Sequence, residues 1–185
     1  MIQPWKQRSS KTIYQNPWWK YQLDEFELPN GVKGEYHYME TTGSVMIVGV
    51  DEQGQIFLIR QYVYLSKDPT LEFPCGGRKA QSVLPDEQRE FGEETNQSAE
   101  HWEHIGFFCP NLGLVKERCD VFVAWKLTAA DFVSDETEHI EVVPVSIEAL
   151  EEKIRHQEIF DGMTLAAWTI AKPFVEKLIR EKKYL

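Results

Sequence analysis

The sequence predicts a fold of mixed α and β structure, built as one domain with a small N-terminal β-unit. Short segments rich in β-branched and aromatic residues recur along the chain, and helical spacing appears in three places. At 185 residues the chain has the usual size of one domain, and a chain of this length buries about two-thirds of its unfolded surface. Its composition, 42% apolar and 27% charged, is typical of globular proteins. We therefore expect it to fold by itself or as an oligomer.

The N-terminal β-unit is predicted from alternating apolar and polar residues between positions 12 and 40. Pro29-Asn30-Gly31 is a strong turn signal, so a hairpin is expected from about Tyr21 to Tyr38. Nearly continuous apolar runs follow, separated by polar turns, and such runs are typical of buried strands. The strands expected after the hairpin are Val45–Val48, Ile56–Ile59, Leu71–Phe73, Glu103–Phe108, Val121–Leu127 and Ile140–Val145.

Three helices are predicted from helical spacing, which in the second of them places Ile147, Leu150 and Ile154 on one face. They are expected at Asp86–Thr95, at Ile147–His156, and from Met163 to about Tyr184. Pro173 falls inside the last helix, where a proline removes one backbone donor and crowds the preceding turn. That helix is therefore expected to kink or split.

Charge and cysteine content exclude several classes of protein. The formal net charge of −10 argues against sequence-blind binding to nucleic acid, because cations supply most of that affinity. An anionic substrate would need a metal ion or a few placed cations, since the overall field repels it. Cys75, Cys109 and Cys119 form an odd set without CxxC spacing, which indicates neither a disulfide framework nor a zinc site. The first residues contain no long apolar run, so we expect no signal peptide, no membrane anchor and a cytoplasmic protein.

Three acids stand within five residues of the first predicted helix. Glu90 and Glu94 are one turn apart and share a face, with Glu93 beside them. Phe91 points elsewhere and can anchor the helix to the core. Hard divalent cations prefer carboxylate oxygens and bridge proteins to phosphates, so the cluster suits metal-assisted attack on a phosphoryl group. From spacing alone, a solvated acidic face with Arg89 paired to Glu93 is the alternative.

The residues around this helix resemble the Nudix box. Arg89-Glu90-Phe91-Gly92-Glu93-Glu94 matches the core of the box, and Pro74-Cys75-Gly76-Gly77 resembles the Pro-Ala-Gly-Gly that precedes it. Further segments resemble the ADP-ribose pyrophosphatases of the Nudix superfamily: Asn16-Pro17-Trp18, Ile59-Arg60-Gln61-Tyr62 and Pro110-Asn111-Leu112-Gly113. Glu136-Thr137-Glu138-His139-Ile140-Glu141-Val142 is similar to the acidic loop that supplies the catalytic base in that group. The similarity covers most of the chain.

The resemblance implies a metal site on the helix. According to this resemblance, Glu90 and Glu94 ligate Mg²⁺ (or Mn²⁺), and the carbonyl group of Cys75 contributes another oxygen. Glu93 is implied as a ligand or as support for one, and counts among the catalytic residues. Arg89 is implied to orient the helix and its acids.

The same resemblance implies which residue acts as the catalytic base. Glu138 or Glu136 would activate the attacking water, with Glu138 favoured, which agrees with a general base beside a metal-bound diphosphate. Glu117 lies in a loop whose glutamate approaches the site in similar proteins, and an ordinary surface acid is an equal alternative.

Trp18 and Arg60, together with Glu117, are expected to bind the substrate. Trp18 can stack on a base, because an aromatic face suits adenine, whereas core packing is favoured for its neighbour Trp19. Arg60 can reach a phosphate as a bidentate donor, although an exposed arginine at a strand end is equally ordinary.

The chain departs from the family pattern in several places. Where the box has a glutamate, counting from Gly76 gives Ser82, with Gln81 as the alternative, and the loop from Gly76 to Arg89 is one residue shorter than usual. Val63 stands where many relatives have an arginine that helps to hold the substrate. Asn96 replaces the closing glycine, which is a mild change because asparagine tolerates the left-handed cap conformation.

The resemblance implies a Nudix fold of the α+β class, a mixed β-sheet sandwiched between helices with an N-terminal β-hairpin extension. Residues 1–40 are expected to form that extension, to contact substrate and to reach across to a partner subunit in a homodimer, with residues 41–185 as the Nudix hydrolase domain. The expected reaction is Mg²⁺-dependent hydrolysis of ADP-ribose or a related nucleotide sugar, which releases a nucleoside monophosphate and a sugar phosphate.

Two alternatives stand beside this reaction. Ser82 and Val63 motivate a non-catalytic Nudix-like module that binds a nucleotide or a protein partner. A hydrolase for another diphosphate, such as a capped nucleotide, is the second. A nucleic acid polymer and a membrane are not expected as partners.

Overall fold

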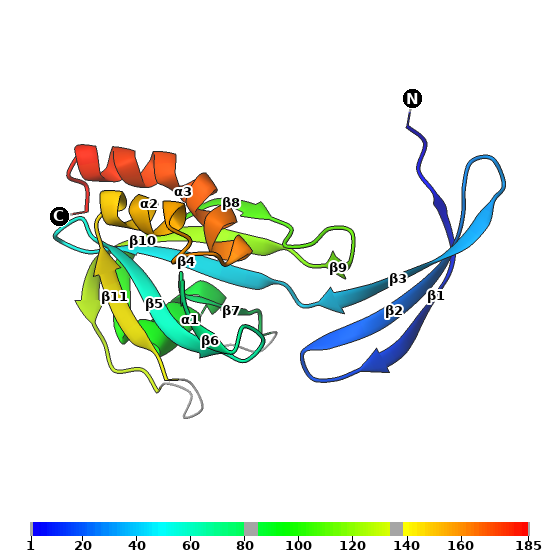
Figure 1. Cartoon of the computed structure of the whole chain (residues 1–185), viewed down its shortest axis with the longest axis horizontal. Coiled ribbons are helices and arrows are strands. Elements are labelled where there is room, and N and C mark those ends of the chain that lie inside the picture. Colours follow the sequence, from blue (N-terminus) through cyan, green and yellow to red (C-terminus); the bar gives the residue numbers. More distant parts are fainter. Residues whose placement is uncertain (1, 80–84, 134–138, 185) are drawn as a thin grey trace. The chain divides into compact units, whose positions relative to one another are not determined.

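The computed structural model describes residues 2–79, 85–133 and 139–184. The chain divides into two compact units, whose elements are labelled in Figure 1. The small unit contains Met1–Gly43 and Cys109–Arg118, and the large unit contains Ser44–Phe108 and Cys119–Leu185. Each unit has its own β-sheet.

The small unit is a sheet with the strand order β1-β2-β3-β9. Its strands are β1 (Lys6–Gln15), β2 (Trp19–Glu27), β3 (Lys33–Thr41) and β9 (Val115–Lys116). β2 and β3 pair antiparallel, from Trp19 opposite Thr41 to Glu27 opposite Lys33. Gly31 in the turn between them has a φ of 86°, a left-handed conformation that glycine adopts without strain. The predicted hairpin is therefore confirmed.

β1 is a strand that the sequence does not predict. Its residues are all exposed, so no buried apolar face marks it in the sequence. It pairs antiparallel with β2, from Lys6 opposite Glu27 to Gln15 opposite Lys20. Asn16 closes the turn between the two strands, because its Oδ1 accepts hydrogen bonds from the N–H groups of Trp18 (3.0 Å) and Trp19 (2.8 Å).

The large unit contains a mixed sheet with the order β11-β5-β4-β10-β8, to which β6 adds beside β5 and β7 beside β4. The strands are β4 (Ser44–Val50), β5 (Ile56–Val63), β6 (Asp68–Glu72), β7 (Cys75–Gly77), β8 (Gln97–Phe108), β10 (Cys119–Ala129) and β11 (Glu141–Val145). β4 is buried along its whole length and runs parallel to β10, whereas the other pairs are antiparallel. A strand buried on both faces explains the continuous apolar run from Val45 to Val48.

Helices cover both faces of this sheet, as the labels in Figure 1 show. Val45 and Ile47 of β4 pack with Phe91 of α1 (Asp86–Thr95). The alternate residues of β4 point to the opposite face, where they join a core with residues of α2 (Ile147–Arg155) and α3 (Gly162–Arg180). The predicted mixed sheet between helices is confirmed.

The boundaries of α1 agree with the prediction, whereas α3 and β8 differ. α3 begins at Gly162, because the Oδ2 of Asp161 accepts a hydrogen bond from the N–H group of Thr164 at 2.7 Å and caps the helix. It continues through Pro173 and ends at Arg180, so of the expected kink or split the structure excludes the split. β8 begins at Gln97, well before the predicted start, because its first half pairs with the end of β10.

None of the helices in the part of the chain that the structure describes is both long enough and apolar enough to cross a membrane.

Candidate active site

Local sequence fixes α1 at both ends and along its buried side. Asp86 and Glu87 lie in the first turn, where the helix dipole favours negative charge. Asn96 ends the helix in the left-handed conformation, with a φ of 52°, and its N–H group donates to the carbonyl oxygen of Gly92 at 2.9 Å. Phe91 is fully buried and faces the ring of Trp102 edge-on, with the ring centroids 5.8 Å apart. This anchor sets the direction in which the acids of α1 point.

Glu90 lies against the backbone of β7. It is 9% exposed, and a Cβ built on Gly76 would lie 2.0 Å from its carboxyl carbon. Only glycine therefore fits at position 76 without displacing the carboxylate. Burial raises the pKa of Glu90, and the neighbouring Arg89 opposes that rise.

Glu94 is held from the same strand. It is 8% exposed, and its Oε2 accepts a hydrogen bond from the N–H group of Cys75 at 3.0 Å. The two acids that share a helical face thus both turn toward β7, whereas the side chain of Glu93 is 30% exposed.

Arg89 joins these groups. Its Nη2 donates to Glu90 Oε1 at 2.6 Å and to the carbonyl oxygen of Gly77 at 3.1 Å, and its Nη1 donates to Glu93 Oε2 at 2.9 Å. Burial works to lower the pKa of Arg89, but Glu90 and Glu93 outweigh burial and the pKa is raised. The Nε of Arg89 is buried and has no hydrogen-bond partner among the residues that the structure describes. The pairing of Arg89 with Glu93 exists, but it forms part of a half-buried network and not of a solvated face.

The donors present at this site suit a hard divalent cation. Carboxylate oxygens of Glu90, Glu93 and Glu94 and a backbone carbonyl are the ligand types that Mg²⁺ and Mn²⁺ prefer. The carboxylate of Glu90 occupies the place that a Cβ at residue 76 would fill, and it can do so because that residue is glycine. Among the described residues no three His, Cys, Asp or Glu side chains are arranged to hold a metal ion, and Arg89 neutralises two of the acids.

The other predicted site residues fall in different places. Arg60 lies on β5, and its Nη1 donates to Glu141 Oε2 at 2.8 Å. Trp18 is 76% exposed and belongs to the small unit, as does the half-buried Glu117. The remaining predicted positions lie outside the described residues: Glu136, Glu138, Gln81 and Ser82. The structure therefore brings together the acids of α1, Arg89 and Cys75.

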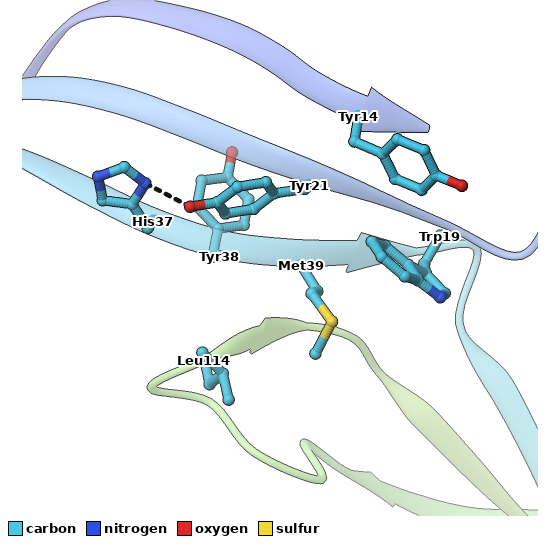
Figure 2. Close-up of a pocket in the computed structure, with 7 residues that line it drawn as sticks. All are labelled: Tyr14, Trp19, Tyr21, His37, Tyr38, Met39 and Leu114. Carbon is cyan, nitrogen blue, oxygen red and sulfur yellow. Dashed lines mark hydrogen bonds between the residues drawn. The ribbon is translucent and has the colours of Figure 1, made fainter. Parts of the chain in front are cut away.

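An aromatic pocket in the small unit is a feature that the sequence does not predict (Figure 2). It has a volume of about 450 Å³ and is lined by Tyr14, Trp19, Tyr21, His37, Tyr38, Met39 and Leu114. The hydroxyl group of Tyr21 is hydrogen-bonded to Nδ1 of His37 at 2.8 Å, as the dashed line in Figure 2 shows. The signal in the sequence is the alternation of Trp19 and Tyr21 along β2, and only the strand register shows that they share a face with His37 and Met39 of β3.

The comparisons with known proteins agree with this architecture. The family model of the nucleoside diphosphate sugar hydrolase N-terminal domain matches residues 5–39. An ADP-ribose pyrophosphatase of Bacillus subtilis (strain 168) is 27% identical over 148 residues, which cover 78% of this chain and 80% of that protein. A crystal structure of an ADP compounds hydrolase superposes with a TM-score of 0.84 at 18% identity, over 97% of this chain and 98% of the other. The chain has the Nudix fold and is similar in sequence to an ADP-ribose pyrophosphatase.

A relative of a different name has similar identity. The methanol dehydrogenase activator of Bacillus methanolicus is 25% identical to this Nudix-fold chain over 151 residues, which cover 80% of the chain and 82% of the relative. Proteins named for hydrolysis and for activation of another enzyme therefore lie at similar distances in sequence.

Proposed function

We propose that this protein hydrolyses the diphosphate bond of ADP-ribose or of a related nucleoside diphosphate sugar. The observation that carries the proposal is the burial of Glu90 and Glu94 against β7, where the absence of a side chain at Gly76 makes room for the carboxylate of Glu90. The proposal is supported by the matching family model, which describes nucleoside diphosphate sugar hydrolases, and by the similarity to an ADP-ribose pyrophosphatase.

The acids of α1 are the proposed metal ligands. Glu90, Glu94 and the Cys75 carbonyl would hold Mg²⁺ (or Mn²⁺), with Glu93 as a further ligand or as support for one. When bound, the ion supplies positive charge that neutralises the phosphate oxygens as they gain negative charge. Arg89 orients Glu90 and Glu93 through its two amino nitrogens, so the carboxylates are placed before the substrate arrives.

The proposed reaction adds water across the diphosphate. Glu138, or alternatively Glu136, accepts the proton as the water oxygen bonds to one phosphorus, and the bond from that phosphorus to the bridging oxygen breaks. The products are a nucleoside monophosphate and a sugar phosphate. Trp18, Arg60 and Glu117 are the proposed substrate contacts. Arg60 would then share its guanidinium between the substrate and Glu141.

The N-terminal extension, residues 1–40, is proposed to serve dimerisation and substrate contact. The exposed strand β1 offers unpaired backbone groups at one edge of the small sheet. Light scattering coupled to gel filtration should give the mass of a homodimer, and a monomer at micromolar concentration would contradict this part of the proposal.

The hydrolase proposal is tested with the full chain, Mg²⁺ and a panel of substrates that contains ADP-ribose, other nucleoside diphosphate sugars and a capped dinucleotide. Products are followed by ³¹P NMR, which distinguishes diphosphate from monophosphate signals. Turnover of a nucleoside diphosphate sugar is expected. Turnover of the capped dinucleotide alone would change the substrate class, and no turnover of any member would reject hydrolysis.

A non-catalytic module that binds a nucleotide or a protein is the second candidate. It is favoured by Ser82 and Gln81, which stand where the box has a glutamate, and by the similarity to a methanol dehydrogenase activator. The same panel distinguishes the two candidates when binding is measured by calorimetry. Tight binding of one nucleotide without its hydrolysis would support the module.

A further inference from the structure

A second charged cluster lies on the sheet face that carries α1, and it consists of Arg78, His104 and Asp120. Asp120 of β10 pairs with Val45 of β4, and Val45 pairs with Gly76 of β7. Residues that pair across neighbouring strands point to the same face of a sheet. Val45 packs with Phe91 of α1, so the side chain of Asp120 faces the same side as the carboxylate helix.

Asp120 organises the cluster. It is 5% exposed, and its Oδ2 accepts a hydrogen bond from Nη2 of Arg78. Its Oδ1 lies 2.8 Å from Nε2 of His104, to which it is hydrogen-bonded. A buried carboxylate needs such partners, and in return it restricts the orientation of the guanidinium that it binds. The Arg78 side chain is nevertheless 40% exposed, so part of it faces solvent.

The backbone of Arg78 directly follows two glycines that contact residues of α1. Gly76 lies against the carboxylate of Glu90, and the carbonyl oxygen of Gly77 accepts a hydrogen bond from Arg89. Arg78 is the next residue along the chain. The same short segment therefore contains the glycine that contacts Glu90 and the arginine that is hydrogen-bonded to Asp120.

A diphosphate at this site needs cations that the chain itself supplies. The net charge of −10 repels an anion, and the charge of a divalent ion ligated by Glu90 and Glu94 is already offset by those two carboxylates. Arg89 already donates to Glu90, to Glu93 and to a backbone carbonyl. Arg78 is partly exposed, points to the α1 side and carries the planar fork of donors that suits phosphate oxygens.

We propose that Arg78, positioned by Asp120, binds the diphosphate of the substrate beside the carboxylate helix. This inference rests on the proposed function, because it names a further residue of the same site. A binding contact of this kind lowers KM more than it raises kcat, since it is present before the chemical step.

The test measures binding and turnover separately. Calorimetry with α,β-methylene-ADP-ribose, whose P–C–P bridge resists hydrolysis, gives Kd in the presence of Mg²⁺. Arg78→Gln is expected to raise Kd, and KM for ADP-ribose, by at least ~10-fold, because the charge-assisted hydrogen bonds are lost. Arg78→Lys keeps a charged partner for Asp120 but lacks the fork of donors. Its Kd and KM are therefore expected to lie between those of wild type and those of Arg78→Gln.

Arg155→Gln is the matched control. Arg155 lies on α2, which covers the other face of the sheet, and forms an exposed ion pair with Glu152. Its replacement should leave Kd and KM unchanged. Circular dichroism reports whether each variant folds, and if Arg78→Gln does not fold, Arg78→Lys decides the matter.

The outcomes separate this inference from the proposed function. Active wild-type protein with unchanged Kd and KM in both Arg78 variants would overturn the inference alone. A wild-type protein that binds the analogue but hydrolyses nothing would reject the proposed function, and a raised Kd in Arg78→Gln would still support the role of Arg78. A wild-type protein that neither binds nor hydrolyses would overturn both.

Discussion

The backbone of Gly76 and the carboxylate of Glu90 are in direct contact, so that a Cβ on residue 76 would lie 2.0 Å from the carboxyl carbon. We predict that Gly76→Ala displaces Glu90 and lowers kcat for ADP-ribose by at least ~100-fold, because a ligand moved by about 1 Å no longer fits the site. Gly77→Ala is the control, since a Cβ there meets nothing within 4 Å. Steady-state kinetics on both variants is the measurement. Equal losses of kcat in the two variants would show that the contact between residue 76 and the Glu90 carboxylate does not cause the loss.

Glu94→Gln tests charge apart from shape. The amide oxygen of glutamine can still accept the hydrogen bond from Cys75, so the fold should survive. The loss of a ligand charge should lower turnover by at least ~100-fold. Activity is compared with the melting temperature of the same preparation. An active variant would remove Glu94 from the proposed metal site.

Gly92→Ala is predicted to destabilise the protein, although alanine is the better helix former by roughly 1 kcal/mol. A Cβ on Gly92 would lie 2.4 Å from the ring of Phe132, which packs against the helix. The double variant Gly92→Ala/Phe132→Ala removes that clash, so urea denaturation should show a coupling between the two changes. Strictly additive free energies of unfolding would exclude this contact as the reason for the glycine.

Glu151 links pH to the packing of α2 on α3. Its pKa is lowered, first by the hydrogen bond from Nε1 of Trp168 at 2.6 Å and then by Lys172. A lowered folded-state pKa stabilises the protein above the ordinary value of 4.5, and that stability is lost as the pH falls through the lowered pKa. Glu151→Gln should therefore be less stable than wild type at pH 7, and the difference should shrink below the ordinary pKa. The measurement is thermal unfolding of both proteins from pH 7 to below the ordinary pKa. A difference in melting temperature that stays constant with pH would contradict the role given to Glu151.

Local signals predicted much of the fold. The hairpin was predicted from a turn glycine between alternating strands, and α1 from helically spaced acids and a residue that tolerates the left-handed cap, and each of these signals acts within a few positions. β1 has no apolar face, and the start of β8 is defined only by its partner strand, so neither has a local signal. The place of Cys109–Arg118 in the small unit depends on the pairing of Met39 with Val115, which joins distant parts of the chain.

The candidate site likewise contains residues that a local sequence signal predicts and residues that it does not. The Nudix box led to the acids of α1 and to Cys75, which the structure places against each other. Arg78 and Asp120 lie far apart in sequence, and only the register of β7, β4 and β10 reveals that they share a face. Pairings of this kind follow from tertiary structure and leave no spacing pattern in the sequence.

The central claim is that Glu90 and Glu94 hold a divalent cation between α1 and β7. Electron paramagnetic resonance of Mn²⁺ measures this directly, because the signal of the free ion decreases as it binds. We predict that wild-type protein with α,β-methylene-ADP-ribose binds Mn²⁺ in a saturable manner, and that Glu90→Gln and Glu94→Gln each weaken this binding at least ~10-fold. The same Mn²⁺ affinity in wild type and in both variants would contradict the account.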